Sequence, residues 1–133
     1  MIFTVVGRIR GKGRPRFGGG HAYTDKRTRD YEELIAEEYR ISGGKMFDGA
    51  VSIKVAALFP VPKRASKKDK ELMLNDKIRP TKRPDIDNIL KAVLDALNGI
   101  AYDDDAYVVS VSGKKIYADN PEQLIIEVRQ VDA

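Results

Sequence analysis

The chain has 133 residues, a net charge of +4 at pH 7, one histidine and no cysteine. The length fits one domain over residues 1–133. Because there are no cysteines, disulfides, zinc–thiolate sites and cysteine nucleophiles are excluded, and the composition suits a reducing cytoplasm. The lone His21 excludes a multi-histidine metal site. Because no apolar run approaches the ~20 residues of a membrane span and the first residues lack the basic start and cleavage site of a signal peptide, we expect a soluble cytoplasmic protein without a membrane partner.

The N-terminal half predicts two strands with a loop and a helix between them. Residues 2–9 are apolar and β-branched, which is typical of a strand. Residues 11–20 are rich in glycine and contain a proline, which predicts a loop without regular structure. Thr28 is the expected cap of a helix that runs to about Ile41. Residues 50–59 alternate between apolar and polar side chains, which indicates a half-buried strand.

The C-terminal half predicts two helices and two strands. Ser66 is the expected cap of a short basic helix through Leu74, and a strong helix follows over residues 86–98. Residues 107–117 and 122–131 alternate as strands, and a turn at 119–121 predicts that they form an antiparallel hairpin. The apolar sets of these strands are Val109 and Val111, then Leu124, Ile126 and Val128.

The sum of these elements is an α/β (α+β) fold with the order β-α-β-(short α)-α-β-β. Four strands would form a small mixed sheet, and the two main helices would cover one of its faces. No internal repeat or linker indicates a second domain.

Basic and acidic side chains are concentrated in separate segments. Residues 8–16 hold five basic side chains and no acid, residues 63–70 hold five against one acid, and acids gather in 30–38 and 85–105. This separation is expected if the basic segments bind a polyanion and the acidic segment binds a metal ion. Ordinary solvated surface is the commoner cause of such charge runs.

The helix over residues 86–98 carries acids at both of its ends. Its apolar side chains form one stripe, and Asp87, Lys91 and Asp95 lie opposite. Asp85 can converge with Asp87 at the helix start, because Pro84 favours extended geometry before the first turn. The simpler interpretation makes Asp85 a cap, Asp87–Lys91 a surface ion pair of ~0.3–0.5 kcal/mol, and residues 103–105 a solvated turn.

These motifs resemble one known family. The matching residues are Lys82 to Ala92, Asp95 to Gly99, Tyr102, Asp104 to Ala106, and Val108 with Val109. They resemble the RusA-type crossover junction endodeoxyribonucleases, which resolve four-way (Holliday) DNA junctions and are common in prophages. Residues 11–17, Tyr23-Thr24 and Tyr31-Glu32 are similar to phage-type members of that family.

The resemblance implies a homodimeric enzyme that uses Mg²⁺, or Mn²⁺ in its place, to make paired symmetrical nicks in branched DNA during recombination and repair. The implied catalytic residues are Asp85, Asp87, Lys91 and Asp105, and the implied metal ligands are Asp85, Asp87, Asp105 and its neighbour Asp104. Asp103 is an additional acid, so which member of the triplet coordinates stays open. Lys91 would neutralise charge on the phosphate or orient the attacking water.

The basic segments and the family motif together give the expected DNA contacts. These are Lys12, Arg14, Arg16, Lys82, Arg83, Asn88, Lys114 and Lys115. Two alternatives remain: a non-catalytic module that binds DNA structures, and another Mg²⁺-dependent nuclease. Restriction-like nucleases commonly carry their acids and lysine on a hairpin, whereas Lys91 lies on a strongly periodic helix. None of these alternatives has a small-molecule substrate.

Overall fold

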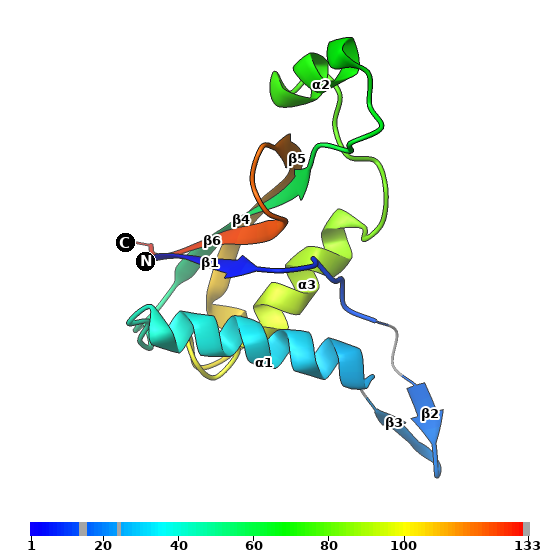
Figure 1. The fold of residues 1–133 in the computed structure, drawn as a ribbon. Helices are drawn as coiled ribbons and strands as arrows, with labels where there is room; N and C mark the ends of the chain where they lie inside the picture. Colours follow the sequence, from blue (N-terminus) through cyan, green and yellow to red (C-terminus); the bar gives the residue numbers. More distant parts are fainter. Residues whose placement is uncertain (14–15, 24, 132–133) are drawn as a thin grey trace.

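A mixed four-stranded sheet with two helices on one face forms the body of the protein (Figure 1). The computed structural model describes residues 1–13, 16–23 and 25–131, with the backbone alone for residues 16 and 21–23. The strands of this sheet are β1 (Ile2–Val6), β4 (Val51–Pro60), β5 (Val108–Ala118) and β6 (Gln123–Gln130), and the helices across it are α1 (Lys26–Ile41) and α3 (Ile86–Leu97). The predicted fold class and the order of the main elements are confirmed.

The core lies between the sheet and the two helices. Alternate residues of β4 and β6 face the helices, and the predicted apolar set of β6 is buried. Ile89, Val93 and Leu97 of α3 are fully buried against this face. Phe3 of β1 packs edge-to-face on Tyr39 of α1, with 5.3 Å between ring centres. The apolar stripe read from residues 86–98 is therefore the surface that fixes α3 to the sheet.

The predicted hairpin between the last two strands is wrong. The strand order is β1-β6-β4-β5, so β4 separates β5 from β6. β4 and β5 pair in parallel, which requires a crossover, and α3 supplies it. β6 then pairs antiparallel with both β4 and β1. Val109 and Val111, which are 61% and 39% exposed, lie on β5 at the edge of the sheet.

The start of α1 also differs from the expectation. The helix begins after Asp25, and Thr28 is a buried residue within it. The Thr28 hydroxyl accepts a hydrogen bond from the Gly13 backbone N–H at 3.1 Å, so this side chain binds the preceding loop instead of capping the helix. The predicted end of the helix at Ile41 is confirmed.

Two small elements project from the body (Figure 1). Part of the segment expected to be an irregular loop, residues 11–20, is the strand β2 (Arg16–Gly18), which pairs with β3 (His21–Tyr23) as a two-stranded ribbon. Gly19 and Gly20 both have positive φ and form the tight turn between them. The short helix α2 (Lys67–Leu74) is confirmed, and the Ser66 hydroxyl caps it by accepting from the Asp69 N–H at 3.1 Å. None of the helices in the described ranges is long and apolar enough to cross a membrane.

Candidate active site and nucleic-acid interface

Two exposed carboxylates stand at the start of α3. Asp85 is extended immediately before the helix, with φ −67° and ψ 148°, as the sequence suggests. Its side chain makes no capping hydrogen bond to the described backbone, which argues against a purely structural cap. Asp87 lies in the first turn of the helix, and one of its oxygens accepts from the Asn88 N–H at 2.9 Å. Both carboxylates sit where the positive end of the helix dipole favours negative charge.

Lys91 follows Asp87 on the exposed side of α3. The two residues are four positions apart, so they share one helix face with Asp95. Within the described residues, no ion pair joins Asp87 to Lys91, although the simpler interpretation of the sequence expects one. Lys91 is therefore an exposed residue on the same helix face as Asp87 and Asp95.

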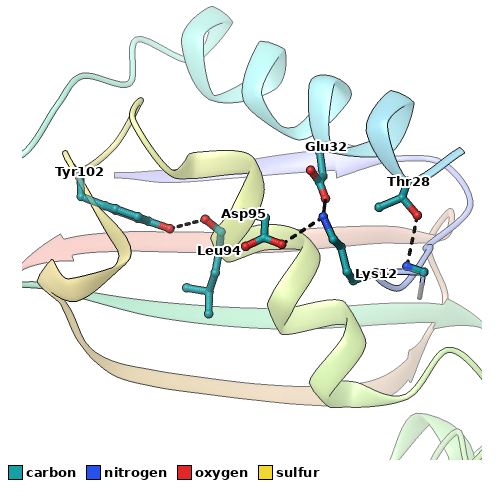
Figure 2. A network of polar contacts seen from close by, with 7 residues as sticks. Lys12, Thr28, Glu32, Leu94, Asp95 and Tyr102 are labelled. Carbon is teal, nitrogen blue, oxygen red and sulfur yellow. Dashed lines mark hydrogen bonds and ion pairs between the residues drawn. The ribbon is translucent and has the colours of Figure 1, made fainter. Parts of the chain in front are cut away.

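The aspartate turn after α3 is fastened to the last turn of that helix. Tyr102 is fully buried, and its hydroxyl donates to the Leu94 carbonyl at 2.5 Å (Figure 2). Asp104 then caps the short 3₁₀ helix η1 (Asp105–Tyr107) by accepting from the Ala106 N–H at 3.1 Å. These contacts hold the aspartate turn beside the C-terminal end of α3.

Asp105 returns to the C-terminal end of α3 and not to its start. Burial raises the pKa of Asp105, and the nearby charges of Asp95 and Asp104 raise it further. Asp87 and Asp95 are separated by eight residues of helix, or about 12 Å. The acids therefore form two groups, one at each end of the exposed face of α3.

The oxygen donors of these acids suit Mg²⁺, which prefers carboxylates and water. Their arrangement fits less well, because within the described residues no three acidic or histidine side chains are placed to hold one metal ion. A single chain therefore presents the proposed ligands separately: Asp85 with Asp87, and Asp104 with Asp105.

A basic hollow of about 480 Å³ opens beside Asp85. The loop after β1, the start of α1 and the start of α3 enclose it, and Glu122 and Phe59 complete its wall. Its basic lining residues are Arg8, Arg10, Lys12, Arg27, Lys82 and Arg83. These six face three acids, so the hollow is electropositive and can attract a phosphate backbone.

Four expected DNA contacts, namely Lys12, Lys82, Arg83 and Asn88, line this hollow. The sequence prediction did not include Arg8, Arg10 and Arg27. Arg8 and Arg10 belong to the basic run that the sequence does show, so that run was the available signal. Arg27 carries no such signal, because only the fold brings the start of α1 to this hollow.

Lys12 fixes the basic loop to both helices (Figure 2). Its ammonium lies 2.7 Å from a Glu32 oxygen and 3.1 Å from an Asp95 oxygen, and its side chain is 15% exposed. Its backbone N–H donates to the Asn88 carbonyl at 2.8 Å. Burial alone would lower the Lys12 pKa, but the hydrogen bonds and charges of Glu32 and Asp95 raise it above the usual value.

Gly11 allows this close approach of the loop to α3. A Cβ atom at Gly11 would lie 2.8 Å from the Asn88 Cβ and 3.0 Å from the Pro84 Cβ. Both are nearer than side-chain carbons normally approach. Gly11 and Lys12 therefore hold the loop against the start of α3, where Arg8, Arg10 and Asp85 line the same hollow.

Lys114 and Lys115 are expected DNA contacts that do not line this hollow. Lys114 and Lys115 are on β5, where Lys115 donates to the Lys82 carbonyl. The ammonium groups of Lys82 and Lys115 lie 5.0 and 5.7 Å from the centre of the Phe59 ring, within the range of cation–π attraction. Lys114 borders a second hollow, on the sheet face away from the helices. Arg14 and the side chain of Arg16 lie outside the described residues.

Comparison with known proteins identifies relatives along nearly the whole chain. The family model described as endodeoxyribonuclease RusA matches residues 7–129. The "Uncharacterized protein YqaN" of Bacillus subtilis (strain 168) is 36% identical over 140 residues, and the match spans 98% of this chain and 96% of that protein.

Proposed function

Because the chain belongs to the RusA endodeoxyribonuclease family, we propose that it resolves four-way DNA junctions by hydrolysing one phosphodiester bond in each of two opposed strands. The observation that carries this proposal is the basic hollow that opens beside Asp85 at the start of α3. Its basic side chains lie beside Asp85, one of the carboxylates that the family motif assigns to catalysis, and this supports the proposal. A twofold homodimer suits the reaction, because it would present one site to each of the two strands.

The cations of the hollow would bind the DNA backbone. Arg8, Arg10, Arg27, Lys82 and Arg83 are the contributing side chains. Contacts with phosphate position a duplex without reading its sequence, so they suit an enzyme that recognises branched structure. Their contribution should weaken steeply as salt increases. Asn88 also lines the hollow and would orient the DNA backbone next to Asp85.

Lys91 is the proposed catalytic cation. It is an exposed residue of α3, four positions from both Asp87 and Asp95, and no ion pair engages it within the described residues. From there it would stabilise the negative charge that develops on the phosphate oxygens in the transition state. This role requires the ammonium group itself, so glutamine at this position should not replace it.

A divalent cation, when bound, would polarise the phosphate and lower the pKa of an attacking water. The proposed ligands are Asp85, Asp87, Asp104 and Asp105, which offer suitable oxygen donors but stand in two groups in the single chain. Chelation tests the metal requirement, with Mg²⁺ as the expected ion and Mn²⁺ as a substitute.

The decisive assay incubates the protein with a synthetic four-way junction and with a linear duplex of matched sequence, each with Mg²⁺ or with EDTA. We expect symmetrical nicks in the junction alone, and none with EDTA. Asp87→Asn should bind the junction and fail to nick it. Asp48→Asn is the matched control, because it makes the same charge change at an exposed position on the side of the loop after the C-terminal end of α3, whereas Asp87 is at the start of that helix. A wild-type protein that binds junctions without nicking them would instead support the non-catalytic module.

A further inference from the structure

A strongly basic arm connects β4 to α3. It comprises residues 61–83, carries α2, and projects from the body of the protein at the end of β4 (Figure 1). Its basic residues are Lys63, Arg64, Lys67, Lys68, Lys70, Lys77, Arg79, Lys82 and Arg83. Nine basic residues against three acidic ones give the arm a net charge of +6. The whole chain has only +4, so the remainder is slightly acidic and the arm holds the excess positive charge.

The charge of this arm is directed to solvent and is largely unpaired. Eight of its nine basic residues are exposed, and α2 has no buried residue. Within the described residues, Arg79 is the one basic residue of the arm with a carboxylate in ion-pair range, Asp76 at 3.1 Å. An ordinary solvated surface mixes charges of both signs. In this arm the basic residues outnumber the acidic ones by nine to three, and self-repulsion makes such an excess of positive charge unfavourable without an anionic partner.

The arm has a defined shape. The Ser66 cap begins α2, and the Lys77 and Ile78 N–H groups both donate to the Leu72 carbonyl, at 2.8 and 3.2 Å, to close its C-terminal end. Pro80 is buried where the chain returns to the body. A fixed array of cations loses less conformational entropy on binding than a disordered tail does.

The end of the arm is continuous with the basic hollow. Lys82 and Arg83 line that hollow, and Lys115 and the Phe59 ring hold Lys82 against the body. A duplex whose cut strand lies beside Asp85 would therefore leave the hollow along a path that the arm flanks.

We propose that the arm of residues 61–83 is a second DNA-binding element, which holds the phosphate backbone of a duplex arm of the junction beyond the site of cleavage. This proposal rests on the proposed function for its choice of partner. The proposal concerns only the affinity for DNA, so measurements of binding test it independently of nicking.

The test removes four exposed cations together in the variant Lys63→Gln, Arg64→Gln, Lys67→Gln and Lys68→Gln. The matched control makes the same charge change on the body, at Arg40, Lys45, Lys54 and Arg129, which are also exposed. Binding to a four-way junction with long arms is measured by fluorescence anisotropy over a series of salt concentrations. Thermal melts of both variants check that the fold is retained.

We expect the arm variant to bind the junction at least about tenfold more weakly than the wild type. The slope of the logarithm of its association constant against the logarithm of salt concentration should decrease in magnitude by about 0.9 for each phosphate contact removed. The control should change little. Single substitutions, Lys67→Gln or Lys68→Gln, should each reduce the slope by about one at most. Saturating protein should restore nicking by the arm variant, because the site on α3 is intact.

Equal affinity and equal slope for the arm and control variants would overturn the proposal. Binding to anionic phospholipid vesicles is measured for the same variants. If the arm variant loses binding to the vesicles but not to the junction, the proposal is also overturned, because that result identifies a membrane surface as the partner. If the wild type binds junctions with the expected slope but never nicks them, the proposed function fails while the arm proposal is still decided by the binding data.

Discussion

The substitution Lys12→Met tests whether the basic loop is locked to α1 and α3. Methionine keeps much of the length of the side chain but removes the ammonium that lies within 3.1 Å of both Glu32 and Asp95. The loss leaves two carboxylates close together without their shared cation. Because these side chains are only 15–29% exposed, the two carboxylates are poorly solvated once the cation is gone.

The expected cost lies between two known limits. Exposed ion pairs contribute about 0.2–1 kcal/mol, and breaking a fully buried pair costs about 3–5 kcal/mol. For this partly buried group we expect a loss of about 2 kcal/mol in the free energy of unfolding. For a chain of this length that corresponds to a decrease in melting temperature of roughly 6–8 °C. Urea unfolding and thermal melts both measure it.

Lys26→Met is the matched control. Lys26 also pairs with one acid, Asp30 at 2.9 Å, but the two side chains are 79% and 60% exposed. Its removal should cost about 0.5 kcal/mol or less. Adding Glu32→Gln to Lys12→Met should recover part of the loss, because one of the two unpaired charges is gone. If Lys12→Met and Lys26→Met lower the free energy of unfolding by the same amount, burial does not strengthen the ion pairs of Lys12, and the reasoning is refuted.

The sign of the pH dependence follows from the raised pKa of Lys12. A group whose pKa is raised on folding contributes fully below its unfolded value, about 10.4, and loses that contribution as pH rises through the folded value. The stability difference between wild type and Lys12→Met should therefore be constant through neutral pH and narrow only at strongly alkaline pH. A difference that disappears near pH 7 would contradict the assignment.

Three further substitutions probe the site. Gly11→Ala should lower the free energy of unfolding by about 1–3 kcal/mol, because its Cβ would lie 2.8 Å from that of Asn88. An unchanged melting curve would show that the loop is not packed against α3. Arg10→Gln should weaken binding of junction and duplex alike and reduce the salt slope by about one, whereas a slope equal to that of wild type would remove Arg10 from the DNA interface. Lys91→Gln should slow nicking about 100-fold or more with little change in junction affinity, and a loss of affinity alone would make it a binding residue.

Local patterns in the sequence predicted α3 well. Its apolar stripe, its first residue and the extended Asp85 before it depend on neighbouring residues, and all three are found in the structure. The Ser66 cap of α2 is local in the same sense. The family motif also lies along this segment, so the residues assigned to catalysis could be named before the fold was known.

Non-local arrangements were predicted less well. A turn between two strands favours a hairpin, but the pairing of β4 with β5 depends on the crossover through α3, which no local signal encodes. The roles of Lys12 and Thr28 were missed for the same reason, since their partners lie 15 to 83 residues away in the chain. The sequence also did not show that Asp105 returns to Asp95 at the far end of α3.

Mapping the cleavage positions tests the central proposal most directly. Each strand of a four-way junction is labelled in turn at its 5′ end, and the products formed with Mg²⁺ are separated on a denaturing gel. We expect one nick at the same distance from the branch point in each of two opposed strands, and intact strands with Asp87→Asn. Intact wild-type reactions, or cuts scattered equally through a linear duplex, would contradict it.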